Sequence, residues 1–172
     1  NMRLVDATGN GEEGIDLEED DDFAGGGELV TAMNGIRTSR NGGGDGGLKI
    51  REKGDGNLDV TLKNILSNDN FGSGIFVRET EGGNSDVEID RAIATGNKFY
   101  NDGEDDFLGH GIELREGQSG SLTASVSNAT SSANDGFGVS GSAGNVTLTH
   151  VGFGGGNALG DTGGGATFVI LP

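Results

Sequence analysis

Apolar and polar residues alternate in short stretches that recur along the whole chain. One kind of stretch follows a glycine, and its clearest copies are Gly74-Ile75-Phe76-Val77-Arg78-Glu79 and Gly111-Ile112-Glu113-Leu114-Arg115-Glu116. Such alternation predicts a short strand with one buried face. The copies begin at Gly14, Gly47, Gly74 and Gly111 and, more weakly, at Gly136 and Gly165.

A second alternating stretch lies between these copies and closes on a polar residue, as in Val60-Thr61-Leu62-Lys63-Asn64. Its closing residues are Asp6, Asn34, Asn64, Arg91, Asn128 and His150, at spacings of 28, 30, 27, 37 and 22 residues. The residues that follow the glycines are spaced by 33, 27, 37, 25 and 29. Two independent landmarks thus share one irregular period near thirty, which is typical of a repeat array.

The repeat predicts an all-β fold, a parallel β-helix (solenoid) of about six coils with three short strands in each. The coils run over residues 1–28, 29–57, 58–84, 85–120, 121–145 and 146–172. The third strand of a coil follows the polar corner and includes Ile36, Leu66, Ile93 or Thr130. We expect residues 1–172 to form one domain and, because the chain opens within a repeat, to be a segment of a longer protein.

In such a fold, equivalent residues of successive coils stack about 4.8 Å apart, so that each coil buries its apolar face against its neighbours. The predicted inner columns of the second stretch are Val30, Val60, Val87, Ala124 and Val146, and then Ala32, Leu62, Ile89, Val126 and Leu148. Those of the glycine stretch are Ile15, Leu48, Ile75, Ile112 and Phe137, and then Leu17, Ile50, Val77, Leu114 and Val139. Stacked asparagines are expected at two corners, with Asn34, Asn64 and Asn128 at the first and Asn70, Asn97 and Asn134 at the second.

The composition suits a solenoid better than a compact globule. Only 31% of the residues are apolar and 36 of the 172 are glycine, which a thin core and many tight turns accommodate. The formal net charge of −17 disfavours nucleic acids and anionic membranes as partners. The absence of cysteine excludes a disulfide framework. No apolar run reaches membrane-spanning length, so we expect no membrane insertion.

The pattern V-x-L/I-x-N, then N, then G-I-x-V/L resembles the repeats of right-handed parallel β-helices of the pectate-lyase-like type. The resemblance covers nearly the whole chain, and it is closest in style to acidic, glycine-rich repeats of large secreted or surface proteins of bacteria. It implies a right-handed coil and an extracellular or cell-surface location. It implies no particular activity, since this fold hosts lyases, hydrolases, adhesins and tail spikes.

Two classes of function stay open at this point. The favoured one is a non-catalytic, adhesin-like structural or binding module, with a neutral glycan, a cell surface or a protein as partner, and with end-to-end or side-by-side self-association. The other is a small carbohydrate-active enzyme of the polysaccharide lyase or glycoside hydrolase type. Its catalytic residues would be sought among carboxylates and a base at outward positions. The candidates are Glu88, Asp90, Glu113 and Arg115.

Calcium is the one candidate cofactor, because carboxylate oxygens are ligands that suit Ca²⁺. The candidate ligands lie in two loops and are Glu19, Asp20 and Asp21, and then Asp102, Glu104, Asp105 and Asp106. A column of glutamates is also expected at the ends of the glycine strands, formed by Glu19, Glu52, Glu79 and Glu116. Four carboxylates at that spacing repel one another unless arginines, a cation or backbone N–H groups neutralise them.

The longest insertion, residues 101–110, produces the 37-residue spacing. Phe99, Tyr100, Phe107 and His110 place ring side chains beside its acidic cluster, either as a binding loop or folded back onto the coil. At the ends of the stack, Met2 and Leu4 are expected at an exposed or partner-covered edge. Residues 166–172 are expected to form a last strand that folds over the apolar column.

Overall fold

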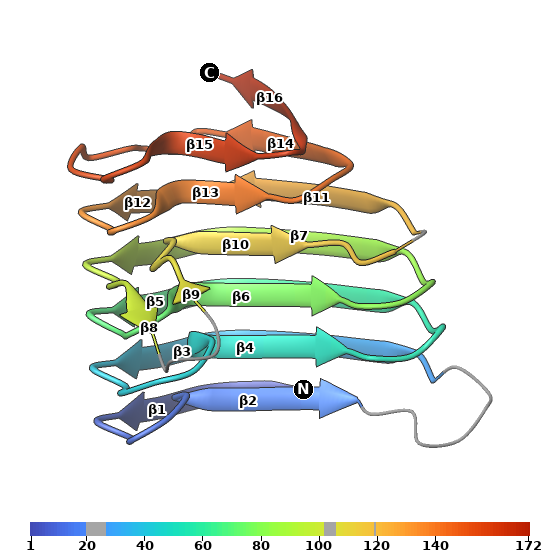
Figure 1. Ribbon diagram of the computed structural model, residues 1–172, viewed down its shortest axis with the longest axis horizontal. Helices are drawn as coiled ribbons and strands as arrows, with labels where there is room; N and C mark the ends of the chain where they lie inside the picture. Colours follow the sequence, from blue (N-terminus) through green and yellow to red (C-terminus); the bar gives the residue numbers. More distant parts are fainter. Residues whose placement is uncertain (20–26, 102–105, 119) are drawn as a thin grey trace.

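The computed structural model describes residues 1–19, 27–101, 106–118 and 120–172, and within them it contains sixteen strands and no helix that could cross a membrane. Eight strands form one parallel sheet and six form another (Figure 1). The first sheet contains β1 (Met2–Thr8), β3 (Leu29–Ser39), β5 (Leu58–Asn68), β7 (Ser85–Thr95), β11 (Leu122–Ser127), β12 (Thr130–Ser132), β14 (Asn145–Thr149) and β16 (Thr167–Leu171). The second contains β2 (Ile15–Glu19), β4 (Gly46–Glu52), β6 (Ser73–Glu79), β10 (Ile112–Arg115), β13 (Phe137–Gly141) and β15 (Gly160–Gly164). β8 (Tyr100–Asn101) and β9 (Asp106–Phe107) form a short antiparallel hairpin.

The chain passes back and forth between the two sheets, and each strand pairs in parallel with the equivalent strand of the next coil. The order is β1-β3-β5-β7-β11-β14-β16 in the larger sheet and β15-β13-β10-β6-β4-β2 in the smaller one. Figure 1 shows the resulting layers, which rise from β1 and β2 to β16. This is the arrangement of a parallel β solenoid, and it confirms that the chain is all-β, parallel and repetitive.

The core lies between the two sheets and contains the central predicted columns. Val60 pairs with Val87 and Leu62 with Ile89 in one sheet. In the other sheet, the same stacking joins two further pairs, Ile75 with Ile112 and Val77 with Leu114. All eight side chains are at most 1% exposed. Because neighbouring coils supply most of this burial, the stability of each coil depends on the next one.

The first corner is a column of residues in the left-handed region of backbone conformation. Asn64, Arg91, Asn128 and His150 have φ angles between 50° and 57°. Gly35 and Leu4 occupy the same position in the first two coils, with φ angles of 72° and 55°. Glycine and asparagine adopt this conformation at the lowest cost, which explains their presence here. The predictions that placed Asn34 and Asp6 at the corner are wrong.

The same shift changes which side of β3 faces the core. Thr31 pairs with Val60 and Met33 with Leu62, and both are buried, whereas Val30 is 63% exposed. The prediction of Val30 and Ala32 as inner residues is therefore wrong. Side chains along a strand point alternately inward and outward. Moving the corner from Asn34 to Gly35 therefore exchanges the inward and outward positions of the residues that precede it.

The corner bends the strands without ending them. β3, β5 and β7 each run for 11 residues through the corner, and only the fifth coil has two separate strands there, β11 and β12. Most coils thus contain two strands in place of the predicted three. Beyond the corner, Ile36 pairs with Ile65, which points inward, and not with Leu66.

The last two coils also depart from the predicted register. Ile112 pairs with Val139 and Leu114 with Gly141, so Phe137 lies outside the column assigned to it. The residues after Gly165 belong to β16, which pairs with β14 and extends the stack instead of folding over its end. The corresponding strand of the smaller sheet is β15.

Both ends of the described stack expose apolar side chains. At the C-terminal end Ile170 is 63% exposed, and at the N-terminal end Leu4 is 88% exposed while Met2 is half-buried. The predicted exposed edge at Leu4 is confirmed. Self-association through such an edge stays a prediction.

A ladder of buried asparagines runs along the second corner, where Asn41, Asn70, Asn97 and Asn134 are fully buried. The Oδ1 of Asn97 accepts hydrogen bonds from the backbone N–H and the Nδ2 of Asn70, both at 3.2 Å. The Oδ1 of Asn134 does the same for Asn97, at 3.1 and 2.9 Å. The ladder therefore satisfies backbone groups that the turn would otherwise bury unpaired. Its predicted members are confirmed, and the prediction missed Asn10, Asn41 and Asn157.

Candidate functional site

Many of the charged side chains that contact one another lie on or beside the outer surface of the smaller sheet, which we call the charged face. In β4, Leu48, Ile50 and Glu52 are buried towards the interior, so Lys49 and Arg51 point outward. The same alternation places residues of β2, β6 and β10 on this face. The charged face consists of Glu13, Asp16, Glu18, Asp45, Lys49, Arg51, Lys53, Arg78, Glu113 and Arg115.

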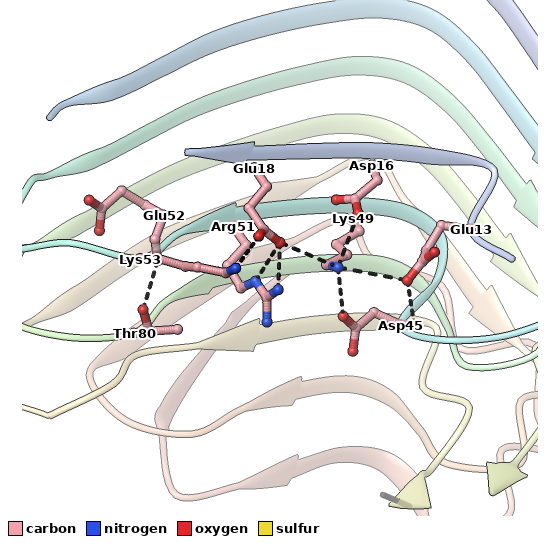
Figure 2. Close-up of polar contacts among 9 residues, drawn as sticks. All are labelled: Glu13, Asp16, Glu18, Asp45, Lys49, Arg51, Glu52, Lys53 and Thr80. Atoms are coloured by element: carbon pink, nitrogen blue, oxygen red, sulfur yellow. Dashed lines mark hydrogen bonds and ion pairs between the residues drawn. The ribbon is translucent and has the colours of Figure 1, made fainter. Parts of the chain in front are cut away.

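Lys49 is the centre of the N-terminal half of this face (Figure 2). Its Nζ lies between 3.1 and 3.7 Å from four carboxylates, those of Glu13, Asp16, Glu18 and Asp45. Burial alone would lower the pKa of Lys49, but Asp16 and Asp45 outweigh it and raise that pKa. Burial likewise would raise the pKa of Glu18, but hydrogen bonds from Lys53 and Arg51 lower it to about 2. Lys49 and Glu18 therefore stay charged at neutral pH, and each is paired with oppositely charged groups of the same network.

Glu113 is buried in the middle of the charged face, and both of its carboxylate oxygens have partners in the chain. Oε2 accepts a hydrogen bond from the Ser73 hydroxyl at 2.5 Å, and Oε1 accepts one from Nε of Arg115 at 2.6 Å. The Arg115 guanidinium also lies 5.4 Å from the centre of the Phe76 ring. These contacts hold Glu113 in place as a structural carboxylate.

His110 is buried beside Glu113. Its Nδ1 accepts a hydrogen bond from the backbone N–H of Phe137 at 2.8 Å, and the two rings stack 5.7 Å apart. Burial lowers the pKa of His110, and the charge of Arg115 adds to this effect while that of Glu113 opposes it. Its Nε2 lies 3.9 Å from Glu113, which is too long for a hydrogen bond. His110 therefore belongs to the packing of the insertion and does not form an acid–base pair with Glu113.

The insertion turns back towards the preceding coils, and its hairpin lies in front of the layers in Figure 1. The Tyr100 ring meets the edge of the Phe71 ring at 6.3 Å between centres, and the Lys98 ammonium lies 5.9 Å from the centre of the same Phe71 ring. Phe99 is 46% exposed. Of the predicted binding loop, Tyr100 and His110 thus pack against other residues of the coils, whereas Phe99 is exposed. The Phe107 side chain lies outside the described residues.

The four candidate catalytic residues lie on two different sheets. Glu88 and Asp90 belong to β7 of the larger sheet, and Glu113 and Arg115 to β10 of the smaller one. Asp90 accepts a hydrogen bond from Nδ2 of Asn128 at 2.9 Å, and this bond is the main cause that lowers the pKa of Asp90. Glu88 forms an ion pair with Lys63 at 3.4 Å. The fold therefore does not bring the four residues into one site.

The predicted calcium ligands are placed only in part. Asp20, Asp21, Asp102, Glu104 and Asp105 lie outside the described residues, as does the side chain of Asp106. The carboxylate of Glu19 is stacked on Glu52 with one oxygen buried, so it is not available to a cation on the loop surface. Within the described ranges, no three ligating side chains form a group that could hold a metal ion. Calcium stays a prediction for residues 19–21 and for the loop of residues 102–106.

This prediction has a direct test in thermal unfolding followed by circular dichroism. If the loop binds Ca²⁺, millimolar Ca²⁺ will raise Tm and a chelator will lower it, because a ligand that binds only the native state stabilises it by mass action. Replacement of Asp102, Glu104, Asp105 and Asp106 by their amides should remove this response. The response to NaCl, which screens charge repulsion, should remain. Identical melting curves with calcium and with chelator would contradict the prediction.

A shallow groove of about 400 Å³ runs along the first corner of the larger sheet. Leu66 and Ile93 supply its apolar side chains, and Ile93 is 46% exposed. Asn64, Arg91 and Asn128 line it with polar groups, and Nε of Arg91 donates a hydrogen bond to Oδ1 of Asn64 at 2.8 Å. The sequence analysis did not predict this groove, because the alternating pattern identifies Arg91 only as the polar residue that closes a stretch.

Comparisons with known proteins give no further guide to function. No family model matches the chain, and no curated protein or solved structure matches it either.

Proposed function

We propose that the chain is a right-handed parallel β-helix that serves as a non-catalytic structural and binding module of a secreted or cell-surface protein. The observation that carries the proposal is the position of the candidate catalytic carboxylates. Glu113 and Asp90 lie on different sheets, and each is held by neighbours in the chain. A lyase or hydrolase needs an acid and a base that face one substrate. Within the described residues Glu113 and Asp90 form no such pair, whereas a stack of coils supplies a rigid, extended surface for binding.

We place the binding surface at the corner groove and take a neutral glycan as its ligand. The side chains of Leu66 and Ile93 suit the C–H face of a sugar ring. Asn64, Arg91 and Asn128 offer donors and acceptors for its hydroxyl groups. The net charge of −17 favours an uncharged ligand over a polyanionic one. A glycan-bearing cell surface would then be the natural partner of an adhesin-like module.

Binding to an array of neutral glycans tests this proposal. We expect Ile93→Glu to reduce binding at least tenfold, because the charge would be desolvated against the sugar ring. Val169→Glu is the matched control, since Val169 is an equally exposed apolar residue on β16 of the same sheet and lies outside the groove. Both variants should melt as the parent does.

Two results would argue against this function. Equal binding by Ile93→Glu and Val169→Glu would remove the groove from the proposal. Cleavage of a glycan by the parent protein, lost on Glu113→Gln or Asp90→Asn, would replace the binding module by a carbohydrate-active enzyme.

A further inference from the structure

Four glutamates, three of them buried and one half-buried, form a column at the ends of the strands of the smaller sheet, which we call the glutamate column. Its members are Glu19, Glu52, Glu79 and Glu116. The strand register stacks Glu19 on Glu52 and Glu52 on Glu79, and the carboxyl of Glu116 lies within hydrogen-bonding reach of Glu79. Glu52 and Glu79 are fully buried and Glu116 is 8% exposed. Stacked acids at such depth require something that offsets their repulsion.

One oxygen of each of the three upper carboxylates is held by the chain. Oε1 of Glu52 accepts a hydrogen bond from the N–H of Gly54 at 2.9 Å, and Oε1 of Glu79 accepts one from the N–H of Glu81 at 2.7 Å. The Ser85 hydroxyl donates to Oε2 of Glu116 at 2.8 Å. A Cβ at Gly120 would collide with the backbone oxygen of Gly83 and with Oε1 of Glu116, which explains the glycine at this position of the turn.

The other oxygen of each glutamate has no hydrogen-bond partner among the residues that the structure describes. The four unpartnered atoms are buried, and they are Oε2 of Glu19, Glu52 and Glu79 and Oε1 of Glu116. A buried carboxylate oxygen without a hydrogen bond is strongly disfavoured. These oxygens therefore point to a proton or another ligand that the described residues do not supply.

The arginines that precede the glutamates do not fill this role. Arg51 and Arg115 bond to Glu18 and Glu113 on the charged face, and Figure 2 shows the Glu52 carboxylate directed away from Arg51. Lys53, in the turn after Glu52, pairs with Glu18 on that same face.

The other described groups around the column are uncharged or exposed. The facing strands place Leu58, Ser85 and Leu122 beside it. The acidic residues of the turns, Asp55 and Glu81, are exposed. Among the described groups, the charges that act on the buried carboxyls are therefore those of the column itself.

We propose that the glutamate column holds two protons, one carried by Glu52 and one carried by Glu116, which donates its proton to Glu79. Each proton turns one carboxylate of the column into an O–H donor beside the unpartnered oxygens of its neighbours. The column then carries two negative charges in place of four. The stack of coils becomes a pH-sensitive device that is most stable in mildly acidic medium and is weakened along this edge as the pH rises.

The protonation of these two residues agrees with their surroundings. Burial is the main cause that raises the pKa of Glu52 from 4.5 to about 7; the N–H of Gly54 opposes it, and Glu79 and Glu19 add to it. Burial likewise raises the pKa of Glu116 from 4.5 to about 7, with a further contribution from Glu79. Since the folded pKa lies above the unfolded one, the stabilisation is complete below pH 4.5 and is lost as the pH rises through 7.

Thermal unfolding of the chain between pH 5 and pH 8, in the presence of chelator, tests the proposal. We expect Tm of the parent to fall across this range. In Glu52→Gln/Glu116→Gln the amide donates the hydrogen bond in place of the proton, so this variant should melt higher than the parent at pH 8 and change less with pH. Glu12→Gln/Glu28→Gln removes two charges from exposed glutamates and should keep the pH dependence of the parent.

A direct titration keeps the proposal testable if the buried variant does not fold. With ¹³C-labelled glutamate in the parent, two carboxyl resonances should titrate with midpoints near pH 7. Midpoints below pH 5 for every glutamate would overturn the proposal, and so would parallel pH curves for the two double variants. A rise of Tm with added Ca²⁺ or Na⁺ at pH 8 that the Glu52→Gln/Glu116→Gln variant lacks would also overturn it, because the unpartnered oxygens would then bind a cation.

Discussion

Replacement of Ile89 by alanine is expected to destabilise the native state by about 2–5 kcal/mol. Ile89 is fully buried, and it lies between Leu62 and Val126 of the neighbouring coils. The truncation removes buried apolar atoms and leaves a cavity. The strands on either side are held in place by their hydrogen bonds to neighbouring coils. They therefore cannot move closer to fill the cavity. Equilibrium unfolding in urea measures the loss.

The matched control for this variant is Glu88→Ala, one residue earlier in β7. Glu88 points outward and is exposed, so its replacement should change the free energy of unfolding by less than about 0.5 kcal/mol. Comparable losses for Ile89→Ala and Glu88→Ala would show that the inward and outward sides of this strand are wrongly assigned.

The second large effect is expected from Asn97→Ala, at about 2–4 kcal/mol. The Oδ1 of Asn97 accepts two hydrogen bonds from Asn70, and its Nδ2 donates to Asn134 at 2.9 Å. Truncation leaves the buried N–H of Asn70 without its acceptor and breaks the two side-chain bonds. The cost therefore comes mainly from polar groups left unpaired in the core, more than from lost apolar contact.

Asn145→Ala provides the comparison for the ladder variant, because Asn145 is an exposed asparagine of β14. Urea unfolding should show little change for Asn145→Ala. Hydrogen exchange of the Asn70 amide should become faster in Asn97→Ala and stay slow in the control. Equal stability of the two variants would contradict a stabilising role for the ladder.

The sequence was most informative where the repeat is intact. In the third coil, Val60 and Leu62 of one stretch and Ile75 and Val77 of the other alternate with polar or outward residues. Period-two alternation determines the buried face directly. The irregular period then predicted the stacking partners, because the glycine stretch and the second stretch each recur once in every coil, whatever the length of that coil.

The predictions failed where more than one register fits the pattern. In Val30-Thr31-Ala32-Met33-Asn34, both sets of alternating positions contain apolar residues, so the pattern does not determine which set faces the core. The asparagine at position 34 led us to predict the corner there. Gly35 adopts the left-handed conformation more easily, and this backbone preference decided the register. In the last coil, β15 consists of Gly-Asp-Thr-Gly-Gly and has no large apolar residue to mark it.

For the charged face and the glutamate column, the sequence predicts where the side chains lie but not which groups they contact. Alternation placed Glu113 on an outward face and Glu79 at a strand end, but it gave no partners. The bond from Ser73 to Glu113 joins residues 40 apart, and it depends on the lengths of the intervening turns. Likewise the N–H groups that hold Glu79 come from a turn whose path no periodicity describes.

Distances between pairs of spin labels test the stack of coils most directly. The chain has no cysteine, so single cysteines can be introduced for labelling at Ala32, Thr147 and Val169 without background. The strand registers place these residues in one outward column, with Ala32 four coils from Thr147 and five from Val169. We predict backbone separations of about 19 and 24 Å, which grow by about 4.8 Å for each coil. Separations that do not increase in this way from Thr147 to Val169 would contradict the parallel stack.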